Sequence, residues 1–204
     1  MNIIIQTLVG TFLFYIGLLL STGTISLLTR NTTFSFLYRC LVAYGSLALC
    51  ALIGVVVSIS LRVVGQHRLT QWIVARSFKF LMITMAGVRF RIIGGQEHLN
   101  VRPAIFIGNH QTALDVLMLG EVFPKYCSVM AKKQLQYIPF LGWFMAMSAT
   151  VFVDRANRKN AVEAMAGAAK EVRDKRQSVF IFPEGTRSNA IEPTLLPFKK
   201  GAFQ

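Results

Sequence analysis

Two long stretches without a charged residue most constrain what this chain can fold into. Residues 1–29 contain no charged side chain, and after Arg30 and Arg39 the stretch 41–61 is again uncharged. Each stretch has about the 20 apolar residues that a helix needs to cross a bilayer core. The first stretch lacks the basic start and the clear cleavage site of a secretory signal. The sequence therefore predicts a membrane anchor of two hydrophobic helices over residues 1–61, either spanning the bilayer (integral) or dipping into one leaflet (monotopic).

Charge is distributed unevenly along the chain. It has 22 Lys and Arg, of which two precede residue 62, and nine Asp and Glu, all of which follow it. Because basic segments stay on the cytoplasmic side of a membrane, we expect the later residues there, where they attract anionic headgroups. A basic protein can instead bind nucleic acid, but these charges are scattered and form no recognition-helix pattern. The sequence therefore favours the lipid bilayer as a partner and not nucleic acid.

Residues 62–87 change in character. Basic side chains alternate there with large apolar ones, among them Arg62, Arg68, Arg76, Trp72 and Phe78. This mixture predicts an amphipathic helix at the membrane interface, which links the anchor to the rest of the chain.

From residue 88 onward, short β-type runs alternate with helical stretches. The runs cover residues 88–93, 104–107, 126–130, 150–153 and 178–182. Such alternation is typical of an α/β domain, here residues 88–204, with a mixed sheet flanked by helices. A helix between the last two runs is predicted by an apolar face at helical spacing, and Asn160 with Glu163 resembles a capping box at its start. The face consists of Val162, Met165, Ala166, Ala169 and Val172.

A further apolar stretch covers residues 138–153 and is too short to span a bilayer. Protein core is the simpler interpretation, and a wall that faces the membrane or an acyl chain is the alternative. The three cysteines, Cys40, Cys50 and Cys127, are far apart and have no ligand or redox spacing, so we expect them to pack.

Two polar residues, His110 and Asp115, follow the predicted strand 104–107. On one continuous helix they would be rotated about 140° apart and would not meet. They can meet if His110 lies in the loop after the strand and Asp115 lies in the first turn of the next helix. Asp115 would then orient one imidazole nitrogen and leave the other free as a base. The alternative is a satisfied polar turn without chemistry.

The run Phe182-Pro183-Glu184-Gly185-Thr186-Arg187-Ser188 follows the last predicted strand. Gly185 permits a tight turn whose backbone N–H groups can face an anion, and Arg187 can bind a phosphate. Glu184 would repel phosphate, so we expect it to position a substrate hydroxyl or to hold Arg187. A plain surface turn is the alternative. Arg155, after strand 150–153, is a second candidate for the phosphate.

Taken together, these motifs resemble those of the glycerolipid acyltransferases, and most closely the 1-acyl-glycerol-3-phosphate acyltransferases. The first family motif is Asn-His-x4-Asp, here Asn109, His110 and Asp115. The second centres on Phe-x-x-Arg, here residues 152–155, and the third is Phe-Pro-Glu-Gly-Thr-Arg-Ser, here residues 182–188. The resemblance covers about residues 88–204.

The resemblance implies a reaction. His110, held by Asp115, would take the proton from the sn-2 hydroxyl of lysophosphatidic acid, which would attack the thioester of acyl-CoA and give phosphatidic acid. Arg155 and the turn of Glu184, Gly185, Thr186 and Arg187 would bind the acceptor. The family uses acyl-CoA as a cosubstrate and needs no cofactor and no metal. It also implies the endoplasmic reticulum membrane, with the catalytic domain cytosolic.

Two departures from the family pattern bear on activity. Ala149 stands where the second motif usually opens with glycine, and a fourth motif would follow beyond Gln204, so the acyltransferase domain is expected to lack its C-terminal part. Two alternatives stay open. The same residues can serve another lysophospholipid or glycerol 3-phosphate, or the chain can be an inactive membrane protein that binds lipid.

Overall fold

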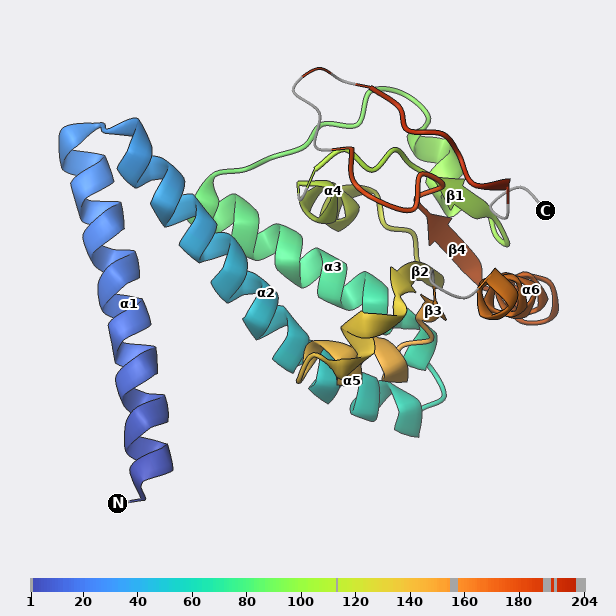
Figure 1. Cartoon of the computed structure of the whole chain (residues 1–204), viewed down its shortest axis with the longest axis horizontal. Coiled ribbons are helices and arrows are strands. Elements are labelled where there is room, and N and C mark those ends of the chain that lie inside the picture. The colour runs from blue at the N-terminus through green and yellow to red at the C-terminus, as the bar shows by residue number, and fades with distance from the viewer. Residues whose placement is uncertain (1, 113, 155–157, 189–191, 193, 201–204) are drawn as a thin grey trace. The chain divides into compact units, whose positions relative to one another are not determined.

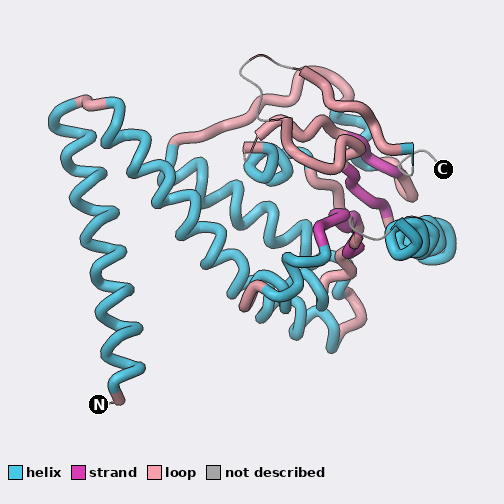
Figure 2. The backbone as a smooth tube through the Cα atoms, viewed as in Figure 1, coloured by secondary structure: helices cyan, strands magenta, loops and turns pink. Residues whose placement is uncertain are grey.

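A computed structural model describes residues 2–112, 114–154, 158–188, 192 and 194–200. The chain forms two compact units, one of residues 1–47 with 81–89 and one of residues 48–80 with 90–204 (Figure 1). Helices make up the first part of the chain, and strands appear only after residue 104 (Figure 2). Whether the predicted boundaries at residues 62 and 88 delimit separately folding parts stays a prediction.

Two long helices, α1 (Ile3–Thr29) and α2 (Thr32–Val63), occupy the predicted anchor. Both are long and apolar enough to cross a membrane. The break between them is set by capping: Arg30 takes a left-handed conformation and its N–H bonds to the Ser26 carbonyl, which ends α1. The Asn31 side chain then accepts from the N–H groups of Thr33 and Phe34 and starts α2.

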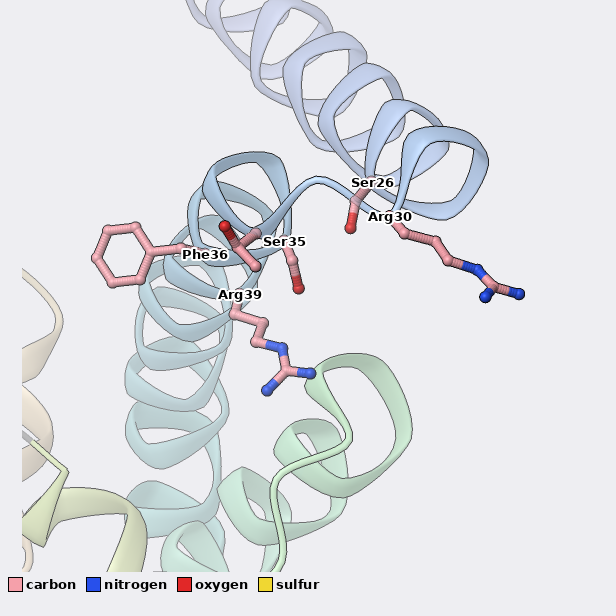
Figure 3. A pocket seen from close by; sticks show the side chains of 6 residues that line it. Ser26, Arg30, Ser35, Phe36 and Arg39 are labelled. Atoms are coloured by element: carbon pink, nitrogen blue, oxygen red, sulfur yellow. The ribbon is translucent and has the colours of Figure 1, made fainter.

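Within the first unit, α1 and α2 are held together by a tyrosine hydroxyl and by close packing at a glycine. The Tyr15 hydroxyl donates to the Leu41 carbonyl, and a Cβ at Gly23 would lie only 3.1 Å from the Tyr38 ring. At the turn, an open hollow of about 430 Å³ is lined by Ser26, Arg30, Thr32, Ser35, Phe36 and Arg39. Figure 3 shows the Arg30 and Arg39 side chains extending in different directions from this hollow, so they do not converge on one point.

The predicted linker segment is built from several short pieces. After α2 come a 3₁₀ turn (His67–Leu69), helix α3 (Thr70–Leu81) and a π-helical turn (Met82–Ala86). Helix α3 buries Thr70, Gln71, Val74 and Phe78. The segment is therefore helical over most of its length, and its position at a membrane interface stays a prediction.

Four of the predicted strands are confirmed as one sheet. They are β1 (Ile105–Ile107), β2 (Cys127–Lys132), β3 (Val151–Val153) and β4 (Ser178–Ile181), in the order β1-β4-β2-β3. The three described pairings are all parallel, with no antiparallel pair of the kind that completes a mixed sheet. Strand β4 lies inside the sheet and is buried along its whole length, as parallel strands covered on both faces are.

The prediction of a strand at residues 88–93 is wrong. These residues form no regular secondary structure and pair with no described strand. Arg89 and Arg91 are exposed, and so are Phe90 and Ile93, which is 85% exposed. Neither side of this segment is therefore buried, and β-propensity alone does not hold a strand in a sheet.

Helices cover the two faces of the sheet and confirm the α/β class. Helix α6 (Arg158–Lys175) places Met165 and Val172 on Val179 and Ile181. Phe180, which points the other way, packs with Phe123 and Cys127 under α3 and helix α4 (Asp115–Val122). The remaining elements are helix α5 (Leu141–Met147) and 3₁₀ turns at Gln96–Asn100 and Lys133–Tyr137.

The predicted details of α6 are partly wrong. Asn160 lies inside the helix and not before it, so it does not cap the helix with Glu163. Val162 is 60% exposed although it belongs to the predicted apolar face. The buried side is set by Met165, Ala168 and Val172, because the helix is rotated slightly from the orientation that its apolar residues suggest.

Candidate functional site

The two main motifs lie side by side because the strands before them are neighbours. β1 and β4 pair in parallel, and the Gly108 N–H continues the ladder to the Ile181 carbonyl at 3.1 Å. His110 follows β1 and the turn at residues 183–188 follows β4. The carboxyl edge of a parallel sheet is where α/β proteins usually bind ligands. The site is therefore positioned by the sheet order.

His110 and Asp115 form the predicted pair. The His110 Nδ1 atom lies 2.7 Å from Asp115 Oδ2, and the side chains are 19% and 14% exposed. The same carboxylate oxygen accepts from the backbone N–H groups of Gln111 and Thr112, at 2.8 and 3.2 Å. The carboxylate at the start of α4 thus folds the loop back on itself, which brings residues five apart together. In a neutral imidazole with Asp115 as acceptor, Nδ1 carries the proton and Nε2 keeps a lone pair that can accept one.

Phe182 supports the imidazole from the neighbouring strand. Its ring is stacked on the His110 ring, with centroids 4.3 Å apart and an interplanar angle of 22°. The stack fixes the plane of the His110 ring, and the contact with Asp115 fixes the direction in which Nδ1 points within that plane. The phenylalanine that opens the third motif therefore has a defined contact with the base of the first.

Glu184 connects three segments of the site through its buried carboxylate. It is 2% exposed. Oε1 accepts from the His110 N–H at 2.8 Å, and Oε2 accepts from the Leu196 N–H at 3.2 Å. We expected Glu184 to position a substrate hydroxyl or to hold Arg187, whereas the structure uses both oxygens on the main chain. Its role in the described contacts is to position His110.

Ser188, at the other end of the turn, also binds the loop that carries His110. Its N–H donates to the His110 carbonyl at 3.0 Å, and its hydroxyl donates to the Gln111 side chain at 3.1 Å. The Gln111 amide in turn donates to the Thr194 carbonyl. Both backbone groups of His110 are therefore held by the third motif, one by Glu184 and one by Ser188.

Gly185 and Lys199 form a feature that the sequence did not single out. Gly185 has a φ of 71°, which favours glycine. A Cβ added there would lie 3.0 Å from Cε and 3.5 Å from Nζ of Lys199. The Lys199 N–H also donates to the Pro183 carbonyl at 2.9 Å, which holds this lysine beside the turn. Lys199 therefore joins Arg187 as a candidate for anion binding.

The remaining predicted binding residues are less constrained. Thr186 and Arg187 are exposed at the turn. Arg155 lies outside the described residues, so its phosphate contact stays a prediction. Its neighbour Asp154 approaches Lys133, with 3.6 Å between Oδ2 and Nζ.

Other chemistry finds little support at this site. Among the described residues, no group of three or more His, Cys, Asp or Glu side chains is placed to hold a metal ion. Cys127, on β2, is fully buried, and burial raises the pKa of its thiol. A protonated, inaccessible thiol is a poor nucleophile, so Cys127 has the packing role that the sequence indicated.

We predict that Glu184→Ala destabilises the protein and lowers its activity. The change leaves the partly buried N–H groups of His110 and Leu196 without acceptors, and each costs up to about 1–3 kcal/mol. Glu184→Gln should be milder, because its amide oxygen can still accept from one of them. Thermal unfolding in detergent measures the effect, with Glu163→Ala, an exposed residue on α6, as the matched control. A Glu184→Ala variant as stable as that control contradicts the positioning role.

The chain is similar in sequence to known acyltransferases. The family model described as Acyltransferase matches residues 90–204. A 1-acyl-sn-glycerol-3-phosphate acyltransferase of Saccharomyces cerevisiae is 46% identical over 170 residues, which are 82% of this chain and 56% of that protein. An uncharacterized acyltransferase of Schizosaccharomyces pombe is 36% identical over 203 residues, which are 100% of this chain and 72% of that protein.

A solved structure shares the fold. It is the crystal structure of the 1-acyl-sn-glycerophosphate (LPA) acyltransferase PlsC from Thermotoga maritima, with a TM-score of 0.62 and 23% identity. The match covers 82% of this chain and 67% of that one. This chain spans 56% of the length of the Saccharomyces cerevisiae protein and about half the length of several animal relatives.

Proposed function

Because this chain belongs to the acyltransferase family, within the group of glycerolipid acyltransferases that act on 1-acyl-sn-glycerol 3-phosphate, we propose that it acylates this lysophosphatidic acid. The proposed donor is acyl-CoA, the acyl group goes to the sn-2 hydroxyl, and the products are phosphatidic acid and CoA. The observation that carries the proposal is the His110–Asp115 pair, which the buried Glu184 carboxylate of the third motif holds beside the turn at residues 183–188.

In the proposed reaction, His110 acts as the general base. Its Nε2 atom takes the proton of the sn-2 hydroxyl as that oxygen attacks the thioester carbonyl. The carbon–sulfur bond then breaks, and the protonated imidazole returns the proton to the CoA thiolate. Asp115 stabilises the imidazolium that forms between these steps, as the carboxylate of a Ser-His-Asp triad does. The acceptor brings its own hydroxyl, so the protein supplies no nucleophile.

The turn after β4 is proposed to bind the acceptor phosphate. The Gly185 N–H donates to the Phe182 carbonyl at 3.0 Å, so it closes the turn and the predicted backbone contact with an anion is not available from it. The proposed contacts are the side chains of Thr186 and Arg187, with Arg155 as a further one. Lys199 adds a positive charge beside Gly185. A guanidinium can bind two phosphate oxygens at once, while an ammonium acts as a point charge.

The substrate is tested by supplying several acceptors to one membrane preparation that contains this chain. CoA release with oleoyl-CoA should be at least about tenfold faster with lysophosphatidic acid than with lysophosphatidylcholine, because only the former presents a terminal phosphate. Glycerol 3-phosphate, which lacks the acyl chain, is the third acceptor. Equal rates with lysophosphatidylcholine would contradict phosphate recognition, and faster release with glycerol 3-phosphate would identify the alternative acceptor.

For Arg187→Ala we expect a selective defect in acceptor binding. The loss of a charged hydrogen bond to phosphate should raise the KM for lysophosphatidic acid by about 10-fold to 100-fold. The KM for acyl-CoA should change by less than about twofold. Initial rates at varied concentrations of each substrate separate the two effects, with Arg173→Ala on the exposed side of α6 as the matched control. An effect confined to acyl-CoA would assign the turn to the other substrate.

The proposed location is the endoplasmic reticulum membrane, with the catalytic domain on the cytosolic side. Helices α1 and α2 support membrane insertion by their length and composition. Arg30, at the turn between them, and Arg39, in the second turn of α2, are the only charged residues before residue 62. An arginine at the centre of a bilayer costs at least about 2.5 kcal/mol, so the turn belongs at a headgroup layer.

A further inference from the structure

Helix α5 is seated on the half of α2 that belongs to the same compact unit (Figure 1). A Cβ at Gly54 would lie 2.5 Å from the Phe144 ring, so α2 presents a glycine where α5 packs. The Arg62 guanidinium donates to the Met147 carbonyl at 3.2 Å. Gly54 and Arg62 are about 12 Å apart along the helix axis. Helix α5 therefore lies level with the last turns of α2.

The opposite side of this segment carries large apolar side chains that the protein does not cover. Gly142, Phe144 and Met145 are buried, whereas Trp143 is 52% exposed and Tyr137 is 73% exposed. Ile138 and Phe140 are exposed as well. The tyrosine, isoleucine, phenylalanine and tryptophan at positions 137, 138, 140 and 143 are here called the aromatic patch.

The backbone holds the patch outward. Phe140 has a φ of 62°, which is rare for a bulky residue. Its ring meets the edge of the Trp143 ring, with centroids 5.0 Å apart. A Cβ at Gly142 would lie 2.1 Å from the Gln136 carbonyl oxygen, so this tight turn requires glycine. Sparsely populated backbone conformations of this kind persist where the surrounding structure fixes them, often at functional positions.

The surroundings of the patch fit a lipid surface. On α2, Val56, Ile59 and Val63 are also exposed, on the side of the helix away from Gly54. Lys132 and Lys133 lie at the start of the 3₁₀ turn that ends at Tyr137, and Lys133 is 3.6 Å from Asp154. Aromatic side chains are enriched at the boundary between headgroups and acyl chains, and nearby lysines attract anionic lipids.

We infer that the aromatic patch enters the headgroup–acyl boundary of the leaflet that holds the last turns of α2. It is a second membrane contact, made by the sheet-bearing unit itself and separate from the hairpin of α1 and α2. It holds α5, and the sheet behind it, against the bilayer, where an acceptor lipid resides. The inference rests on the proposed insertion of α2, but it requires no acyl transfer.

Tryptophan fluorescence tests the inference. The chain has two tryptophans, so Trp72→Phe leaves Trp143 as the reporter. The full chain is reconstituted in vesicles of phosphatidylcholine and phosphatidylglycerol, with or without bromine at the 6 and 7 positions of the acyl chains. Bromine should reduce Trp143 emission by about half or more, and aqueous iodide should quench it little. Emission that iodide quenches and bromine does not would overturn the inference.

Two further variants guard against misfolding and indirect effects. Tyr137→Trp in a chain without the native tryptophans tests the patch from a second position and should give the same pattern. Val162→Trp in that chain is the matched control: the position is 60% exposed on α6, and it should be quenched by iodide and not by bromine. Shielding of Trp143 from both quenchers would overturn the inference in favour of a protein contact, such as a second copy.

These readouts separate the inference from the proposed function. Bromine quenching of Trp143 in a chain that releases no CoA supports the membrane contact and contradicts the proposed acyl transfer. CoA release by a chain whose Trp143 is open to iodide supports the reaction and overturns the contact.

Discussion

A His110→Ala variant is expected to lose acyl transfer by about 10³-fold, because the base that removes the acceptor proton is gone. The remaining parts of the site should still bind lipid, since Asp115 and the turn at residues 183–188 do not depend on the imidazole. CoA release with saturating lysophosphatidic acid and oleoyl-CoA measures the loss. Lysophosphatidic acid binding, followed by equilibrium dialysis in detergent, should change by less than about threefold.

The chain offers a matched control for this variant. His98 is 75% exposed in its side chain and contacts only Glu97 among the described ion pairs, so His98→Ala should retain full activity. The His110 ring is stacked on Phe182, so its removal costs some stability, and thermal unfolding should be recorded beside the rates. Turnover by a folded His110→Ala variant at the rate of the His98→Ala variant would remove His110 from the mechanism.

An Asp115→Asn variant is expected to lower kcat by about 10²-fold to 10⁴-fold, because a neutral amide does not stabilise the imidazolium that forms in the reaction. The amide oxygen can still accept from the N–H groups of Gln111 and Thr112, so the loop should keep its course. KM for both substrates should therefore change little. Steady-state rates and thermal unfolding together separate the charge of Asp115 from its part in the loop.

Glu121 provides the comparison on the same helix. It lies in the last turn of α4 and pairs with Lys79 at 2.8 Å, away from His110. Glu121→Gln removes one carboxylate charge from α4 and should leave kcat within about twofold of the parent chain. If Asp115→Asn leaves kcat as little changed as Glu121→Gln does, the Asp115 carboxylate holds the loop and takes no part in the reaction.

The sequence predicted those features that side-chain patterns encode directly. Two uncharged stretches gave α1 and α2, and apolar runs ended by glycine or proline gave the four strands. The contact of His110 with Asp115 was predicted because a loop after a strand and the first turn of a helix are local structures. In the Ile138–Val153 stretch, the core interpretation holds for Phe144, which is buried, whereas Trp143 is exposed. A wall that faces the membrane or an acyl chain stays a prediction.

Contacts to the main chain were not predictable in the same way. Glu184 binds the N–H groups of His110 and Leu196, and an N–H group is present at almost every position, so the sequence contains no signal for that choice. Lys199 reaches Gly185 because its own N–H bonds to Pro183. The strand wrongly predicted at residues 88–93 failed for the opposite reason, since its side-chain pattern is right but no described strand lies beside it.

The sheet order also determines when the site can exist during synthesis. Strand β1 is paired only with β4 among the described strands, and β4 lies between β1 and β2. The groups that hold His110, on Glu184 and Ser188, are made more than 70 residues after it. At about 5–20 residues per second, a ribosome needs several seconds to add them. A nascent chain therefore carries His110 without these main-chain contacts until β4 closes the sheet.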